Sequence, residues 1–119
     1  MSYDLAVWLG EEPATDREAE KEHNRLYDEY LEGEELTPPV MEISKFLAAL
    51  TDRWPDRHTD DDSPWASTPL AASASGPYVY LALAWSSAER VSAYVAEVAH
   101  RFGLNCFDPQ SRSLRRNES

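Results

Sequence analysis

The stretch Tyr78-Val-Tyr-Leu-Ala-Leu-Ala-Trp85 carries the strongest strand signal in the chain. It follows a Ser75-Gly76-Pro77 turn, and its aromatic and aliphatic side chains occupy both faces. An apolar character on both faces is typical of an interior strand covered by a helical layer. A second apolar run, Tyr3–Leu9, ends at Gly10. We expect these two strands to lie in the middle of one sheet.

Three helices and two shorter strands are predicted around this pair. The pattern of apolar spacing and end signals predicts helices over Thr15–Glu32, Thr37–Trp54 and Ser86–Phe102, and strands over Pro69–Ala74 and Leu104–Phe107. Capping boxes are expected where Thr15 precedes Glu18 and where Ser86 precedes Glu89. The apolar stripe of the first helix consists of Ala19, His23, Leu26, Tyr27, Tyr30 and Leu31.

The predicted element order is therefore β-α-α-β-β-α-β. This order favours an α+β two-layer sandwich, namely a ferredoxin-like four-stranded mixed sheet with helices on one face. A three-layer arrangement is the alternative. We expect a single domain over residues 1–109, followed by a polar C-terminal tail over 110–119.

Composition excludes several classes of protein. The 119 residues carry a formal net charge of −11, which argues against binding to a phosphate backbone. No apolar run approaches the roughly 18 residues of a membrane span, and the start of the chain lacks the basic region of a secretory signal. The single cysteine, Cys106, excludes an internal disulfide and argues against a cysteine-based zinc cluster. We therefore expect a cytoplasmic protein.

The acidic residues are concentrated in the N-terminal half. Residues 1–64 hold 18 acidic and 6 basic side chains, whereas residues 65–119 hold 4 and 5. The segment from Glu11 to Glu35 alone has a net charge of −8. Like charges at neighbouring helical positions destabilise a helix slightly, so folding alone does not require this density. It indicates either a solvated helical face or a docking face for a basic partner.

The docking interpretation gives a set of expected contact residues and a non-enzymatic function. Tryptophan in a loop or at a strand end is either a core residue or an interface anchor. Trp65 and Trp85 both fit that description, whereas the pattern around Trp8 and Trp54 places them in the core. The residues expected to bind a partner are Glu18, Glu22, Asp28, Glu29, Glu32, Asp60, Asp61, Asp62 and Trp65.

Two alternative functions remain open. His58 with Asp60–Asp62 could hold a divalent cation and serve a small metal-dependent hydrolase, although the spacing does not match a calcium-binding loop with its glycine and distal glutamate. A structural or regulatory subunit that pairs through a strand edge is the other. The sequence contains no glycine-rich phosphate loop and no nucleophile motif, and Cys106 on a strand is expected to be a buried, inert thiol. We expect no metal, no cofactor, and a monomer or weak dimer.

Three stretches resemble a family of small, acidic, stand-alone bacterial proteins, most of them uncharacterised. They are Met1-Ser-Tyr-Asp-Leu-Ala-Val-Trp8, Ser63-Pro-Trp65 with Ala74-Ser-Gly-Pro77, and Gly103-Leu-Asn-Cys-Phe-Asp-Pro-Gln110. In size, acidity and layout the chain is also similar in type to the immunity proteins of polymorphic and contact-dependent toxins. That similarity implies a small cytoplasmic protein that occludes a toxin domain, often a nuclease, and it implies no particular site residue.

Overall fold

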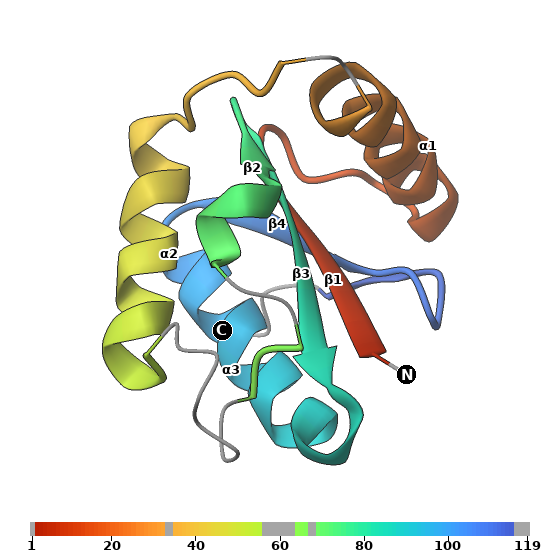
Figure 1. Ribbon diagram of the computed structural model, residues 1–119. Helices are drawn as coiled ribbons and strands as arrows, with labels where there is room; N and C mark the ends of the chain where they lie inside the picture. Colours follow the sequence, from red (N-terminus) through yellow and green to blue (C-terminus); the bar gives the residue numbers. More distant parts are fainter. Residues whose placement is uncertain (1, 33–34, 56–63, 67–68, 116–119) are drawn as a thin grey trace.

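The computed structural model describes residues 2–32, 35–55, 64–66 and 69–115. These residues form an α+β fold in which a five-stranded antiparallel sheet of order β2-β3-β1-β4-β5 is packed with three α-helices (Figure 1). In chain order the elements are β1 (Ser2–Leu9), α1 (Asp16–Leu26), the π-helical turn η1 (Tyr27–Leu31), α2 (Met41–Arg53), the 3-10 turn η2 (Leu70–Ser73), β2 (Ala74–Ser75), β3 (Tyr78–Ala84), the 3-10 turn η3 (Trp85–Ser87), α3 (Ala88–Arg101), β4 (Leu104–Asp108) and β5 (Ser113–Arg115).

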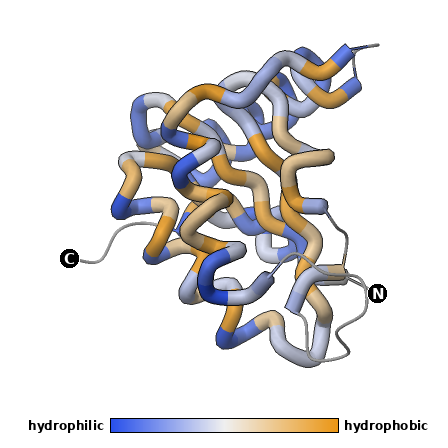
Figure 2. The backbone as a smooth tube through the Cα atoms, turned by 60° about the vertical axis from the view of Figure 1, so that its left-hand side comes forward, coloured by the Kyte–Doolittle hydropathy of each residue, from blue (hydrophilic) through white to orange (hydrophobic). Residues whose placement is uncertain are grey.

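Helices cover both faces of the sheet. Side chains of β1 alternate, so that Leu5 and Val7 join a core with α2 and α3, whereas Ala6 and Trp8 join a second core with α1. Figure 1 shows α1 on one side of the strands and α2 with α3 on the other. The prediction of a two-layer sandwich with helices on one face is therefore wrong, and the arrangement is the three-layer alternative. Hydrophobic colouring follows the strands through the middle of the molecule (Figure 2).

The sheet itself differs from the predicted one in three respects. The predicted strand Pro69–Ala74 is wrong over most of its length, because Leu70–Ser73 form the 3-10 turn η2 and β2 consists only of Ala74–Ser75. All strand pairs are antiparallel, so the predicted mixed sheet is wrong. A fifth strand also forms within the expected tail, where Leu114 pairs with Phe107 and is only 8% exposed. The ferredoxin-like four-stranded layout is therefore not confirmed. The interior placement of β1 and β3 is confirmed, because each has a neighbour on both sides.

The first helix forms where the sequence predicts it. Thr15 is its N-cap, and its Oγ1 accepts the Glu18 backbone N–H at 3.1 Å, while the Glu18 carboxylate accepts the N–H of Ala14. Ala19, His23 and Leu26 are buried against the sheet, and the predicted stripe continues into η1. Contacts from β5 and the turn before it also hold α1, because Arg112 in that turn pairs with Glu20 and Leu114 N–H on β5 donates to Asp16 Oδ1 at 3.0 Å.

The other two helices begin later than predicted. Residues 37–40 are extended, since Thr37 N–H donates to Ser75 Oγ and Val40 N–H donates to Gly76 O, and α2 starts only at Met41. The predicted Ser86–Glu89 capping box is wrong, because η3 occupies residues 85–87 and the N-cap Ser87 makes no side-chain cap bond. Within the described residues, none of the helices has the length and apolar character needed to cross a bilayer.

The turn between β2 and β3 generates the first prediction. Gly76 has φ +55°, and a Cβ there would lie 2.9 Å from Cε1 of Tyr30 in η1. We expect Gly76→Ala to lower the free energy of unfolding by about 2–3 kcal/mol, because left-handed strain and a steric clash add. Urea denaturation measures this value.

Gly103→Ala is the matched control. Gly103 also has a positive φ, +74°, but a Cβ there meets nothing within 4 Å, so only the backbone strain of about 1 kcal/mol is expected. Equal losses in the two variants would mean that Tyr30 moves aside without cost, against this account.

Candidate functional site

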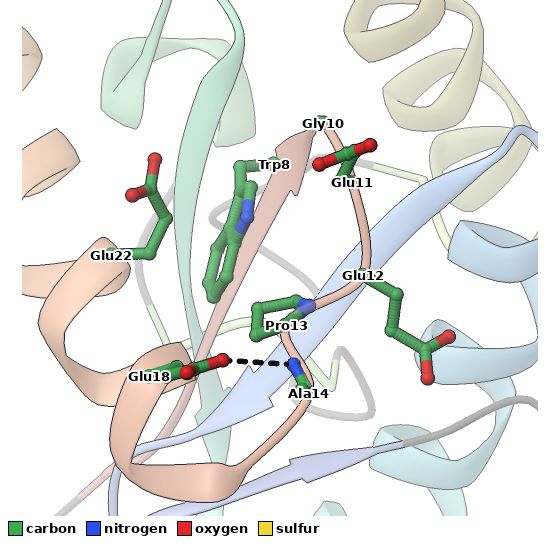
Figure 3. Close-up of a pocket in the computed structure, with 8 residues that line it drawn as sticks. All are labelled: Trp8, Gly10, Glu11, Glu12, Pro13, Ala14, Glu18 and Glu22. Carbon is green, nitrogen blue, oxygen red and sulfur yellow. Dashed lines mark hydrogen bonds between the residues drawn. The ribbon is translucent and has the colours of Figure 1, made fainter.

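A pocket rich in glutamate lies between the loop after β1 and the first turns of α1. Its volume is about 520 Å³, and we call it the glutamate pocket. The Trp8 ring lies between α1, which carries Glu18 and Glu22, and the loop, which carries Glu11 and Glu12 (Figure 3). The lining residues are Trp8, Gly10, Glu11, Glu12, Pro13, Ala14, Glu18 and Glu22.

The walls of this pocket are fixed by the sheet and by the helix start. Trp8 is 1% exposed and packs against Phe107, with ring centroids 6.3 Å apart. The Asn105 side-chain amide on β4 donates to the carbonyls of both Gly10 and Glu11 at 3.2 Å, which ties the loop to the sheet. The hydrogen bond between Ala14 and Glu18 closes the other side of the loop. The four carboxylates therefore project from a backbone that is held in place.

The acidic surface continues along α1 beyond the pocket. Glu22, Arg25 and Glu29 lie three and four residues apart, and the Arg25 guanidinium pairs with both carboxylates, at 2.5 Å and 2.9 Å. One cation thus serves two anions, which leaves the strip negative. Ionic hydrogen bonding to Glu22 is the main cause that raises the pKa of Arg25. The strip runs from Glu18 on α1 to Glu29 on η1.

The structure brings together part of the predicted contact set. Glu18 and Glu22 share the glutamate pocket, and Glu29 continues the same strip. Asp28 and Glu32 are exposed at η1 and its C-terminal end. Asp60, Asp61 and Asp62 lie outside the described residues, as does His58 of the alternative metal site. Glu11 and Glu12 also line the pocket, although the sequence analysis included them only in the acidic segment and not among the site residues. The signal that could have identified them is their position directly after Gly10, which ends the strand.

Trp65 does not lie on the surface, contrary to the prediction that it anchors a partner. It is 6% exposed, belongs to the core shared with α2 and α3, and its Nε1 donates to the Trp54 carbonyl at 2.8 Å. Trp54 packs edge-on against it. Because the indole N–H is satisfied internally and the ring is enclosed, Trp65 has a structural role, which is the alternative that the sequence left open.

Metal binding and thiol chemistry receive no support from the described part of the chain. Among residues 2–32, 35–55, 64–66 and 69–115, no three His, Cys, Asp or Glu side chains are grouped so as to hold a metal ion. Cys106 is fully buried on β4, and burial raises the pKa of its thiol to about 12. The prediction of a buried, inert thiol is confirmed, since a thiol with that pKa supplies little thiolate near neutral pH.

Beneath the acidic strip, α1 docks on the sheet through a histidine. His23 is 9% exposed, and its Nδ1 lies 2.8 Å from the Tyr78 hydroxyl. The rings of Tyr27, Tyr80 and Phe107 surround it, at centroid distances of 5.4–6.2 Å. Burial lowers the pKa of His23, and the charge of nearby Glu20 only partly opposes this effect. The helix that carries the glutamates is therefore seated on a neutral imidazole.

This contact predicts a loss of stability on acidification. The pKa of His23 is lower in the folded chain than its ordinary value of 6.5, so the unfolded chain binds the proton more readily. The stabilisation is fully present above about pH 6.5 and is lost as the pH falls below it, by at most about 1.4 kcal/mol for each pH unit. Urea denaturation of the wild type and of His23→Gln between pH 5 and pH 8 tests this. The variant should show a flatter profile across that range; parallel profiles would contradict the assignment.

Comparison of the chain with family models, with curated proteins and with solved structures gives no match.

Proposed function

We propose that this protein is a non-enzymatic binding protein that neutralises a basic protein partner, and that the partner is the nuclease domain of a toxin. The observation that supports this proposal is the glutamate pocket, which four glutamates line and which continues into the acidic strip along α1 and η1. The corresponding role is that of an immunity protein acting in the cytoplasm.

The charge balance around the pocket favours a cationic occupant. Among the residues that the structure describes, Glu22 and Glu29 share a single guanidinium, and the carboxylate of Glu18 is bonded to a backbone amide rather than to a cation. A concave site lined by one sign of charge concentrates its field and accelerates the capture of an oppositely charged partner. A nuclease must attract phosphate, so its active site presents lysine and arginine. Such a surface is complementary to the glutamate pocket.

The fixed loop adds selectivity to this attraction. Asn105 holds the carbonyls of Gly10 and Glu11, so the adjacent carboxylates are offered from an ordered backbone. Binding of a partner side chain therefore requires little further ordering of the site, and this lower entropic cost increases affinity. A solvated face that serves only solubility would require neither the pocket nor the tie to β4.

The proposal is tested by charge removal without a change of shape. The variant Glu18→Gln/Glu22→Gln/Glu29→Gln removes three charges from the pocket and strip. Immobilised wild-type protein is used to isolate basic proteins from the native host, and the captured protein is then assayed for nuclease activity with and without the wild type. We expect stoichiometric inhibition, and an association rate that falls about ten-fold or more for the variant at low salt. The difference should shrink as salt screens the charges.

A control variant removes the same number of charges from the opposite face. Glu42→Gln/Asp52→Asn/Glu97→Gln changes α2 and α3, which pack on the other side of the sheet. Its association rate should match that of the wild type. Equal rates for all three proteins, or a captured protein whose nuclease activity is absent or uninhibited, would refute the proposed function.

A further inference from the structure

A second pocket lies at the other end of the β1–β3 pair. It has a volume of about 390 Å³, and we call it the Trp85 pocket; its lining residues are Tyr3, Trp85, Ser86, Ala88, Glu89 and Arg115. In the sheet register Tyr3 pairs with Leu83, whereas Trp8 of the glutamate pocket pairs with Tyr78. Figure 1 shows the end of β3 and the turn into α3 at the bottom of the sheet, beside the N-terminus. The two pockets are therefore separate sites.

Trp85 is the feature that distinguishes this pocket. The structure describes all four tryptophans; Trp8 and Trp65 are enclosed and Trp54 is half-buried, whereas Trp85 is 53% exposed. Its ring lies 5.6 Å from that of Tyr3, tilted by 51°, so Tyr3 supports only part of it. Covering a large exposed ring with a second apolar or aromatic surface is favourable, because it removes apolar area from water. The open part of Trp85 thus offers a stacking surface for a planar group.

Arg115 supplies a fixed cation in the same pocket. Its Nη2 donates to Ser92 Oγ at 3.0 Å and to the Tyr3 hydroxyl at 3.4 Å, and lies 3.6 Å from the Asp108 carboxylate. Asp108 is 2% exposed and also accepts hydrogen bonds from Tyr3 and Gln110. The contacts of the Arg115 guanidinium all use Nη2, and neither its Nη1 nor its Nε donates to any other residue that the structure describes. A guanidinium held by one corner keeps donors that match a carboxylate.

Glu89 gives the pocket its third chemical feature. It lies in the first turn of α3, is exposed, and lines the same cavity as Arg115 and Trp85. A purely anionic ligand would be repelled by the Glu89 carboxylate, and a purely cationic ligand would be repelled by the Arg115 guanidinium. A ligand with both charges and a ring satisfies all three residues. Such a ligand is neutral overall, so the net charge of −11 on the chain does not repel it.

We propose that the Trp85 pocket binds a free aromatic α-amino acid, with the ring stacked on Trp85, the carboxylate on Arg115 and the ammonium group on Glu89. A volume of 390 Å³ falls within the usual range for small-molecule sites. This binding activity is independent of the glutamate pocket and of any protein partner. The residues of the pocket come from β1, η3, α3 and β5, so the ligand also links both ends of the chain.

The experiment uses L-phenylalanine as the probe and compares it with three truncated analogues. Phenethylamine lacks the carboxylate, 3-phenylpropionate lacks the ammonium group and L-alanine lacks the ring. Isothermal calorimetry reports binding to the wild type, and so does tryptophan fluorescence, whose ligand-induced change should disappear in Trp85→Ala. We expect L-phenylalanine to saturate below about 10 mM and each analogue to bind about ten-fold more weakly or worse, because each loses one of the three contacts.

Variants of the pocket should reproduce the pattern of the analogues. Trp85→Ala and Glu89→Gln change exposed side chains, so they test binding without endangering the fold, and each should weaken L-phenylalanine binding about ten-fold or more. Arg115→Gln should do the same but also removes a partner of Asp108, so its fold must be checked by circular dichroism. Met41→Ala and Arg101→Gln, exposed changes elsewhere on α2 and α3, are controls and should bind like the wild type.

Two outcomes overturn the proposal. One is the absence of saturable binding of L-phenylalanine to the wild type, which would leave Trp85 as a cover over Tyr3. The other is binding that Trp85→Ala and Glu89→Gln leave unchanged. The variant Glu18→Gln/Glu22→Gln/Glu29→Gln should bind L-phenylalanine normally, so failure of either pocket is distinguishable from failure of the other.

Discussion

Burial of β1 on both faces is the constraint on which the remaining structure depends. Leu5, Ala6 and Val7 have no exposed surface, and the strand has β3 on one side and β4 on the other. A strand with apolar groups on both faces needs a cover on each, and α1 supplies one while α2 and α3 supply the other. The position of β1 also places the two pockets, because one opens at its C-terminal end and the other at its N-terminal end.

Local signals predicted the elements that depend on local interactions. The start of α1 was predictable because the Thr15 hydroxyl accepts the Glu18 backbone N–H within one turn of helix. Its buried face was predictable because Ala19, His23 and Leu26 repeat at helical spacing. The start of α2 was not predictable in this way. Thr37 is held by Ser75, 38 residues further along the chain, and no pattern near Thr37 encodes that bond. The side of the sheet on which each helix packs is equally non-local.

The fifth strand and the sites show the same limit. Ser113–Arg115 has no apolar run, and it becomes a strand because β4 offers its edge and Asp108 accepts the N–H groups of Gln110 and Ser111 in the connecting turn. The acidic character of the candidate site was readable from composition, but the concavity was not, since Asn105 shapes it from the far end of the sequence. Trp65 was misassigned for a related reason: its ring is enclosed by Trp54 and the core, which only the tertiary fold brings to it.

Hydrogen bonds to main-chain groups occupy part of the β3 edge that the two-residue β2 leaves uncovered, and part of the outer strand β5, which bears on how this protein can assemble. Beyond β3, Ala66 N–H donates to Ala82 O and Ala84 N–H donates to Pro64 O, so a short irregular segment occupies that margin. At the opposite margin Asp16 accepts the N–H of Leu114. A second chain that tried to extend the sheet at these positions would first have to break those bonds. Fibril growth and edge-to-edge dimers are disfavoured there, so a partner that approaches these positions must bind through side-chain contacts rather than by pairing a strand with the sheet.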